Sequence, residues 1–471
     1  MPRHPHRPVL LSILTLLLAA PAIHGGEAAN FVLIFADDQG YQDVGCYGSP
    51  KIKTPNLDRM AAEGMRLTDF YVSAPVCSAS RAALMTGCYC DRVSLTGVLF
   101  PKNTTGLHPH EITIAEVLKT RGYATACIGK WHLGHHPEFL PTSQGFDSYF
   151  GIPYSNDMTI DPEMRLAENV VLREGVTIEQ LRGEKPRKDW VPLMRNDEVV
   201  EYPCDQTTLT QRYTRDAVEF IRANKDRPFF LYLPHTMPHV PLFASEDFSG
   251  KSARGLYGDT IEEIDWSVGQ ILDALRETGT DENTLVVYTS DNGPWLAKGD
   301  HGGCALPLRD GKFTTYEGGM RLPCIARYPG KIPSGAVCRE VAATIDLLPT
   351  FAELAGAEVP RDRVIDGRSI WPLLSGRPGA KSPHETYFYR TNAVRYGKWK
   401  LHVKANSTVK ERPAGDVPQL YDLSTDISES NNVAADHAEI VEQLAKLLED
   451  HKAEITENRR PIGDLGKMAE R

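Results

Sequence analysis

The stretch Asn30-Phe31-Val32-Leu33-Ile34-Phe35-Ala36-Asp37-Asp38 contains an apolar run that stops at two aspartates. A run without polar alternation is typical of a parallel strand that is buried on both faces. Three more such strands are predicted at residues 123–128, 228–233 and 283–289, with helices at 56–65, 111–121, 211–224 and 259–278. This alternation predicts an α/β fold in which a large, mostly parallel sheet is sandwiched by helices.

Each of the four predicted strands is followed by ionisable or metal-binding side chains. These are Asp37-Asp38, Lys130 with His132, His235 with His239, and Asp291-Asn292. Open parallel sheets bind their ligands at the carboxyl ends of the strands. We therefore expect these side chains to meet in one site.

Residues 1–26 have the features of an export signal. Arg3 and Arg7 provide a positive start, Val9 to Ala20 form an apolar run, and Ala20-Pro21-Ala22 has the small residues of a cleavage site. The apolar run is too short to span a bilayer, and no later stretch is long and apolar enough. We expect a secreted or periplasmic protein with no membrane span in the mature chain; an uncleaved anchor is the alternative.

The remaining 445 or so residues fit one large domain and a smaller one. We predict a catalytic domain at residues 27–382 and a C-terminal α+β subdomain at 383–471, an antiparallel sheet with one helix near 438–454. Residues 156–206 are charged and proline-containing, and we interpret them as an insertion over the site edge. Such an insertion either shapes the substrate pocket or is a solvated loop.

The composition excludes some classes of function. A formal net charge of −10 argues against general nucleic-acid binding, which needs a basic face. The nine cysteines are an odd number, so that some disulfides are compatible with export and one cysteine is left over. Cys77 is the natural candidate for the unpaired one.

Cys77 lies in the segment Ala74-Pro75-Val76-Cys77-Ser78-Ala79-Ser80-Arg81-Ala82-Ala83-Leu84-Met85-Thr86-Gly87. Residues 80–85 are expected to begin a helix that Gly87 ends, and the free N–H groups of its first turn would face Cys77. The segment therefore predicts an anion site. The alternative is a buried cysteine that precedes a helix.

The side chains of Asp37, Asp38, Asp291 and Asn292 offer only hard oxygen ligands. Such a set favours Ca²⁺, with Mg²⁺ as the alternative, over zinc. Adjacent carboxylates also repel each other unless a cation lies between them. Taken alone, Asp37-Asp38 is more often a turn with a helix cap; the pairing with Asp291-Asn292 favours the metal site.

Lysines and histidines complete the candidate set. Lys130 and Lys312 can neutralise the oxygens of an oxyanion, and Lys312 lies in a glycine-containing loop that ends with Glu317-Gly318-Gly319. His132, His235 and His239 can act as acid or base near neutral pH. A single histidine of this kind is more often structural.

In combination, these motifs resemble the type I sulfatase family of the alkaline-phosphatase-like superfamily, nearest to the arylsulfatase A and N-acetylgalactosamine-6-sulfatase group. The matching segments are residues 36–40, Cys77-Ser78-Ala79-Ser80-Arg81, residues 129–134, Gly151-Ile152-Pro153-Tyr154-Ser155, residues 238–241, residues 290–293 and the Lys312 loop. Ala79 occupies a position that is most often proline in eukaryotic relatives, a variant that bacterial sulfatases share.

The resemblance implies a role for each candidate residue. Cys77 would be oxidised to formylglycine by a formylglycine-generating enzyme and would ligate one Ca²⁺ with Asp37, Asp38, Asp291 and Asn292. Arg81 would orient the formylglycine diol, and His132 would be the base at the nucleophile. The sulfate ester would be bound by Lys130, Ser155, His235, His239 and Lys312.

The reaction that the resemblance implies is the release of sulfate from a sulfated small molecule or glycan through a covalent mechanism. A hydroxyl of the diol attacks sulfur, and His239 or a neighbouring lysine protonates the leaving alcohol. His132 then removes the proton of the second hydroxyl, which expels sulfate. The alternatives are a formylglycine-dependent phosphonate or phosphate ester hydrolase and an inactive glycan-binding relative.

Overall fold

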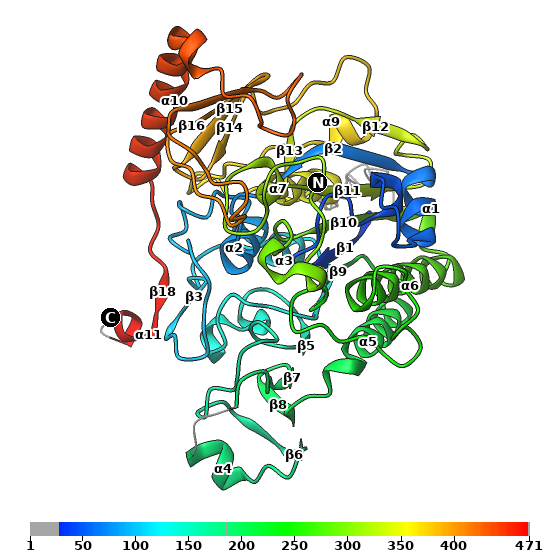
Figure 1. The fold of residues 1–471 in the computed structure, drawn as a ribbon. Helices are drawn as coiled ribbons and strands as arrows, with labels where there is room; N and C mark the ends of the chain where they lie inside the picture. The colour runs from blue at the N-terminus through cyan, green and yellow to red at the C-terminus, as the bar shows by residue number, and fades with distance from the viewer. Residues whose placement is uncertain (1–27, 184–186, 470–471) are drawn as a thin grey trace, which may run out of the picture.

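The computed structural model describes residues 28–183 and 187–469; the predicted export signal at 1–26 lies outside these ranges. A twelve-stranded sheet forms the centre (Figure 1). Its parallel part runs in the order β10 (Thr284–Ser290), β1 (Asn30–Ala36), β9 (Phe229–Pro234), β4 (Ala124–Ile128) and β5 (Ser148–Gly151). The four predicted strands are thus confirmed, and they are neighbours.

Burial explains why these segments form the centre. Every residue of β1, β4, β9 and β10 is buried, which matches their unbroken apolar sequences. The register places Ala36 opposite Ser290 and Phe35 opposite Pro234. The chain segments that follow β1, β9 and β10 therefore leave the sheet at the same level.

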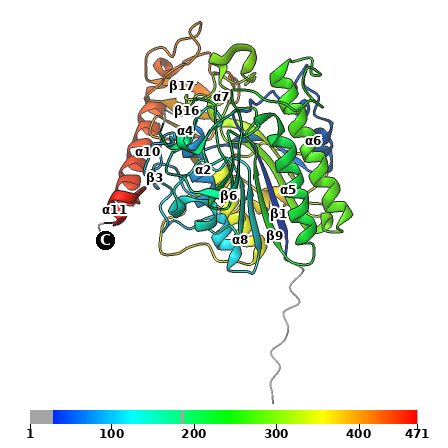
Figure 2. The ribbon, with the colours of Figure 1, turned by 90° about the horizontal axis from the view of Figure 1, so that it is seen from below.

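Helices cover both faces of the sheet, as predicted. Figure 2 shows α5 (Leu209–Ala223) and α6 (Leu256–Glu277) on one face, with α2 (Cys77–Thr86) and α8 (Leu347–Ala355) on the other. The helix α1 (Pro55–Glu63) packs against α6, and α3 (Ile114–Lys119) packs against α8. The expected helices are confirmed, with ends that differ by a few residues.

One edge of the sheet is antiparallel, which the sequence pattern did not predict. The strand β11 (Arg321–Arg327) pairs antiparallel with both β10 and β2 (Met65–Tyr71). Beyond it, β12 (Ala336–Cys338) and β13 (Ala342–Ala343) pair parallel with β2. The sheet is therefore mixed at this edge and parallel at its centre.

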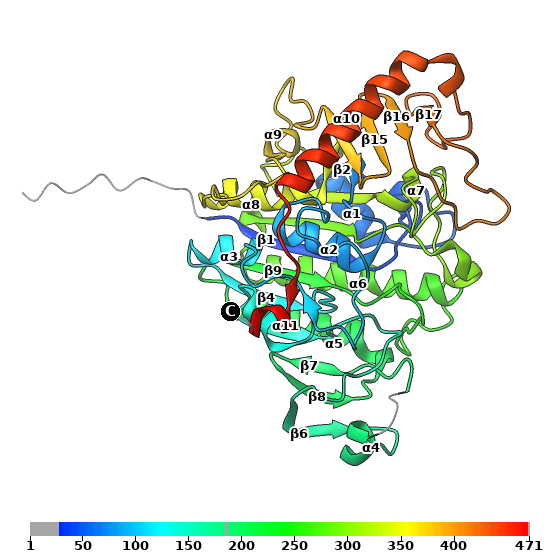
Figure 3. The same ribbon diagram turned by 90° about the vertical axis from the view of Figure 1, so that its left-hand side faces the viewer.

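The interpretation of residues 156–206 as an insertion over the site edge is wrong for most of the segment. Its strands β6 (Leu166–Leu172), β7 (Leu193–Arg195) and β8 (Glu198–Tyr202) extend the main sheet beyond β5, where β7 pairs antiparallel with β5. The helix α4 (Ile178–Gly183) and β6 lie at the far end of the molecule from α10 (Figure 3). The segment is thus mainly an extension of the sheet edge, held by backbone pairing between strands.

The C-terminal region forms the predicted small antiparallel sheet with one helix. Its strands are β14 (Thr386–Tyr389), β15 (Ala393–Tyr396), β16 (Trp399–His402) and β17 (Gln419–Asp422). The helix α10 (Ala438–Glu457) packs Leu444 and Leu448 against Val394, Leu401 and Leu420 of this sheet. The shorter elements are β3 (Thr105–Gly106) paired with β18 (Gly463–Asp464), α7 (Glu317–Met320), α9 (Trp371–Leu374) and α11 (Leu465–Ala469).

The cysteines do not form the disulfides that export made plausible. All nine, including Cys77, are free thiols in the structure. Among the described residues, no helix combines the length and the apolar character needed to cross a bilayer.

Candidate active site

Cys77 is the first residue of α2, one turn earlier than predicted. The residue before it, Val76, is extended, and the first helical hydrogen bond runs from Ser80 N to Val76 O at 3.0 Å. The N–H groups of residues 77–79 thus precede the helical hydrogen-bond ladder, and they carry the partial positive charge of the helix N-terminus. Cys77 is 2% exposed, and Gly87, with φ of 66°, ends the helix in the left-handed conformation as expected.

The carboxylates at the ends of β1 and β10 meet directly. The backbone N–H of Asp38 donates to Asp291 Oδ1 at 3.1 Å, and Asn292 Nδ2 donates to Asp38 Oδ1 at 2.7 Å. Asp38 has φ of 66°, a conformation that aspartate tolerates better than most residues. All four predicted metal ligands from the two strand ends are buried.

Three cations surround these carboxylates. Arg81 donates from Nε and Nη2 to Asp291 Oδ2 at 3.1 and 2.9 Å. Lys130 Nζ contacts Asp37 Oδ2 and lies 3.3 Å from Ser155 Oγ, and Lys312 Nζ lies 2.8 Å from Asp38. Burial would lower the pKa of Lys312, but the charges of Asp38, Cys77 and Asp37 together outweigh it and raise that pKa, so the lysine is a cation.

Unpartnered oxygens and crowded carboxylates fit a bound divalent cation. The formal charges of the three aspartates and the three basic side chains cancel, so that a metal ion would give the site a net positive charge. Within the described residues, Asp37 Oδ1 and Asn292 Oδ1 are fully buried and have no hydrogen-bond partner. Burial and the charge of Asp37 raise the pKa of Asp291 to about 6. Orphaned hard oxygens and crowded carboxylates are what Ca²⁺ relieves.

The Cys77 side chain lies among these charges. Burial raises the pKa of its thiol, while the charges of Lys130 and Lys312 oppose that rise and those of Asp37 and Asp291 add to it. The side chain at position 77 is therefore within electrostatic range of both lysines and two aspartates. The sequence prediction that these groups share one site is supported by this arrangement.

His239 joins the cluster through a network with Ser155 and Asn156. Its Nδ1 lies 2.6 Å from the carbonyl of Val240 and 3.0 Å from Asn156 Oδ1. Because a carbonyl can only accept, Nδ1 carries the proton in the neutral ring, which leaves Nε2 as an acceptor. Nε2 lies 3.4 Å from Ser155 Oγ and 3.6 Å from Asp38 Oδ2. Burial and the two lysines lower the pKa of His239 well below its usual value.

His132 presents a free nitrogen. Its Nε2 donates to the carbonyl of Leu99 at 2.9 Å, and its Nδ1 is buried without a partner among the described residues. The neutral ring therefore has an unshared electron pair at Nδ1. Burial, followed by the charge of Lys130, lowers the pKa of His132 well below its usual value.

His235 is separated from the cluster. Its side-chain contact runs from Nε2 to Ser267 Oγ on α6 at 3.4 Å, and burial alone lowers its pKa to about 3. His235 is the first residue after β9, and this contact places its side chain toward α6. The structure thus gives no contact that supports the expected substrate-binding role.

Sequence reasoning missed two groups that hold the histidines. Asn156 orients His239, and it directly follows the Gly151–Ser155 motif, so extension of the motif by one residue would have found it. The Leu99 carbonyl fixes His132, while the Leu99 N–H donates to Ser78 Oγ beside Cys77 at 3.1 Å. No side-chain signal marks a backbone carbonyl of this kind.

Comparisons with known proteins agree with this geometry. A family model described as Sulfatase matches residues 29–357, and one described as N-sulphoglucosamine sulphohydrolase, C-terminal, matches residues 308–454. Arylsulfatase A of Homo sapiens is 41% identical over 463 residues, which cover 92% of this chain and 89% of that protein. N-acetylgalactosamine-6-sulfatase of Canis lupus familiaris is 40% identical over 410 residues, which cover 83% and 75%.

A solved structure is similar over almost the same extent. The crystal structure of Ps i-CgsB in complex with k-i-k-neocarrahexaose has a TM-score of 0.75 and 31% sequence identity, and the alignment covers 90% of this chain and 92% of that one. The family match spans the central sheet and every residue of the charged cluster. The chain therefore belongs to the type I sulfatase family and is a sulfuric ester hydrolase.

Proposed function

We propose that this sulfatase uses a formylglycine derived from Cys77, together with one Ca²⁺, to release sulfate from a sulfated carbohydrate. The observation that carries the proposal is the position of Cys77, at the N-terminus of α2 and within electrostatic range of Lys130, Lys312, Asp37 and Asp291. Oxidation of Cys77 to formylglycine would supply a hydrated aldehyde, a nucleophile that a buried thiol does not provide.

The calcium ligands we propose are Asp37, Asp38, Asp291, Asn292 and the side chain at position 77. The ion would give the site a net positive charge, which would offset the charge of the sulfate group. The unpartnered oxygens of Asp37 and Asn292 support this ligand set. Mg²⁺ is the alternative ion, although it demands a stricter octahedral geometry.

The lysines and the first turn of α2 would bind the sulfate group. Lys130 and Lys312 are buried, and each contacts a different carboxylate of the Asp37-Asp38 pair. In such a dry site, fixed positive groups stabilise the charge on sulfuryl oxygens more than they would in water. Ser155 would keep Lys130 in place through its hydroxyl oxygen.

The histidines would differ in their proton roles. His132 has its lone pair at Nδ1, which suits a base, because Nε2 is committed to the Leu99 carbonyl. His239 has its proton at Nδ1, held by Val240 O, so Nε2 has no proton to donate in the neutral ring. The leaving alcohol would need a proton from either His239 or a neighbouring lysine. The missing proton at Nε2 favours the lysine. Arg81, held by Asp291, would orient the group at position 77.

The substrate class and the cellular context are further parts of the proposal. A sulfated carbohydrate is supported by the name of one relative, an N-acetylgalactosamine-6-sulfatase, and by the oligosaccharide in one similar structure. Maturation would require a formylglycine-generating enzyme before or during export directed by residues 1–26. We also retain the division into a catalytic domain at 27–382 and a C-terminal subdomain at 383–471, since β14–β17 form a separate sheet.

Mass spectrometry of the tryptic peptide that contains position 77 tests the modification. Protein made with its native modifying system should show formylglycine there, and Cys77→Ala should lose sulfate release. Cys338→Ala is the matched control, because Cys338 is a buried thiol on β12, remote from the charged cluster. An unmodified thiol in active protein, or full activity in Cys77→Ala, would overturn the mechanism.

The substrate preference separates the remaining alternatives. The enzyme should have a higher kcat/KM for 4-nitrophenyl sulfate than for the matching phosphate and phosphonate esters. A preference for the phosphorus esters would favour the phosphohydrolase alternative. Glycan binding with no release of sulfate from fully modified protein would favour the inactive glycan-binding relative.

A further inference from the structure

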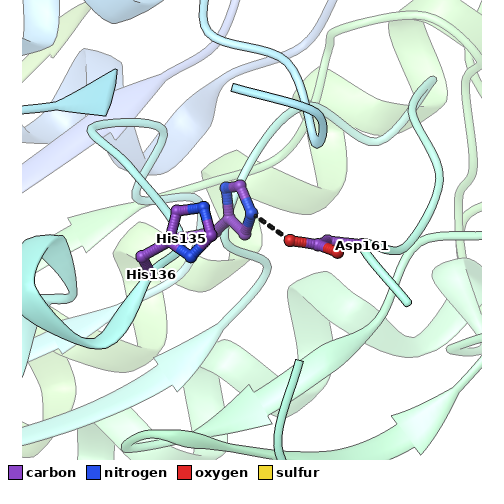
Figure 4. A group of neighbouring side chains, drawn as sticks. All are labelled: His135, His136 and Asp161. Carbon is purple, nitrogen blue, oxygen red and sulfur yellow. Dashed lines mark hydrogen bonds and ion pairs between the residues drawn. The ribbon is translucent and has the colours of Figure 1, made fainter. Parts of the chain in front are cut away.

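A second group of metal-ligating side chains lies outside the charged cluster. It consists of His135, His136 and Asp161, and Figure 4 shows the two imidazole rings side by side with the carboxylate pointing toward His135. His135 Nε2 lies 2.8 Å from Asp161 Oδ2, and the ring centroids of the two histidines are 4.2 Å apart. One ligand atom from each residue lies within 4.8 Å of the others.

These distances are close to those of a zinc site. Two ligands in a tetrahedral site with bonds of about 2.0–2.1 Å lie ~3.3 Å apart. His135 Nε2 and Asp161 Oδ2 would therefore separate by about 0.5 Å when a metal ion replaces the proton between them. The His136 ligand atom, which lies within 4.8 Å of the other two, would move inward by up to about 1.5 Å, which a side-chain rotation can provide.

The surroundings already orient the ligands. Asp161 Oδ1 accepts a hydrogen bond from Glu163 N at 3.0 Å, which leaves Oδ2 for a ligand. The backbone N–H of Asp161 donates to Tyr154 Oη at 3.0 Å, and the Tyr154 ring packs edge-on against His135 at 5.4 Å. Fixed outer contacts of this kind are what hold metal ligands in position. His135 is 5% exposed, and the other two ligands are half-buried.

We propose that His135, His136 and Asp161 form a binding site for a transition metal ion of the Zn²⁺ class. Two imidazoles and one carboxylate suit Zn²⁺, whereas the all-oxygen set at Asp37, Asp38, Asp291 and Asn292 suits Ca²⁺. The two sites would therefore select different metals. Three protein ligands leave a coordination position for water or for an anionic group.

The location links this site to the catalytic residues. His135 follows His132 by three residues, and Asp161 follows Ser155 by six, so a metal ion would join the two segments that carry them. Asp161 also lines a cavity of about 640 Å³, whose other walls include Phe100, Lys102 and Lys188. The proposed metal site would thus border a cavity that is also lined by two lysine side chains.

Metal binding is measured on the full-length protein by titration with Zn²⁺ under Ca²⁺-saturated conditions and by the visible spectrum after Co²⁺ is added. The wild type should bind one equivalent of Zn²⁺ at this site and show the absorption of tetrahedral Co²⁺. His136→Ala and Asp161→Asn should each weaken Zn²⁺ binding by at least about 10- to 100-fold, the range seen even for loss of outer contacts. His301→Ala removes an exposed imidazole elsewhere and should leave binding unchanged.

Asp161→Asn keeps an acceptor for His135 and therefore guards against misfolding as the cause of lost binding. Asn292→Ala, which alters the proposed calcium site, should keep the Zn²⁺ equivalent. The proposal is overturned if the wild type binds no stoichiometric Zn²⁺, or if both ligand variants bind it as the wild type does. Because the readout is metal content, the result does not depend on the formylglycine mechanism.

Discussion

The substitution Lys400→Met tests how the small C-terminal sheet supports the Lys312 loop. Lys400 of β16 is fully buried, and its Nζ lies 2.8 Å from Glu317 Oε1 and 2.9 Å from Glu429 Oε1. Glu317 begins α7, five residues after Lys312. Burial would raise the pKa of Glu317, but Lys400, Arg321 and Arg395 outweigh it and hold that pKa below its usual value. Glu317 is therefore ionised, and its ionised state depends on the neighbouring basic side chains.

Removal of the Lys400 ammonium leaves two buried carboxylates with fewer cations. The loss of one partner from a buried ion pair costs about 3–5 kcal/mol, because the remaining charge is uncompensated. Glu429 keeps His402 Nε2 at 3.0 Å and Glu317 N at 2.7 Å, and Glu317 keeps Arg321, so we expect the lower part of this range. For 471 residues the unfolding entropy is about 1 kcal/mol/K, which converts the loss to a fall in Tm of about 3 °C.

The assay is thermal unfolding by calorimetry at pH 7 for five proteins: the wild type, Lys400→Met, Lys398→Met, Glu317→Gln and the double variant. Lys398→Met is the matched control, because Lys398 is 52% exposed and its ion pair with Asp422 is worth only about 0–1 kcal/mol. The double variant Lys400→Met with Glu317→Gln removes one charge of each sign and should recover about 1 kcal/mol or more relative to additivity. Equal effects of Lys400→Met and Lys398→Met, or strict additivity in the double variant, would refute the argument.

Three further predictions concern the metal site, the helix end and pH. Asn292→Ala should weaken Ca²⁺ binding by about 10-fold or more, as measured by calorimetric titration. Because the substitution changes no charge, excess Ca²⁺ should restore activity. Activity that does not respond to Ca²⁺ would contradict this prediction. Gly87→Ala should cost about 1–2 kcal/mol, because Gly87 has φ of 66° and a Cβ would approach Leu348 and Ile365 to 3.2 Å. Gly122→Ala, with φ of 79° and open space, should cost less, and denaturant unfolding compares the two. Burial raises the pKa of Asp265 from 3.8 to about 6. The folded state therefore holds this proton more tightly than the unfolded state does, which stabilises the fold fully below pH 4. This contribution, about 3 kcal/mol, is lost as pH rises through 6. Asp265→Asn should remove this part of the pH dependence of Tm, and an unchanged profile would show that Asp265 does not titrate in this range.

Local patterns were sufficient to predict the centre of the fold and most of the site. The unbroken apolar runs of β1, β4, β9 and β10 required burial on both faces, which only a covered parallel sheet provides. A parallel arrangement then brings the carboxyl ends of the strands together whatever their order. This is why the aspartates, Lys130 and His239 could be assigned to one edge, and why α2 could be predicted beside them.

The tertiary structure decided whatever depends on register and on the direction of a side chain. His235 and His239 follow the same strand, yet His235 contacts Ser267 on α6, whereas His239 reaches Ser155 in the cluster. Both residues lie beyond Pro234, the last residue of β9, so their side-chain directions depend on how the following loop packs, which no local pattern shows. Strand pairing likewise turned residues 156–206 into an extension of the sheet.

The amino-acid sequence by itself thus determined the α/β sheet, the charged edge and the position of Cys77 before a helix, since these follow from hydrophobic periodicity and short motifs. Only the tertiary structure showed that Asn156 and the Leu99 carbonyl fix the protons of His239 and His132. Only it brought Asp161 to His135, because the two residues are 26 positions apart and neither lies in a regular element. Contacts between residues so far apart in the sequence depend on how the loops pack against the folded sheet. Local interactions do not specify that packing.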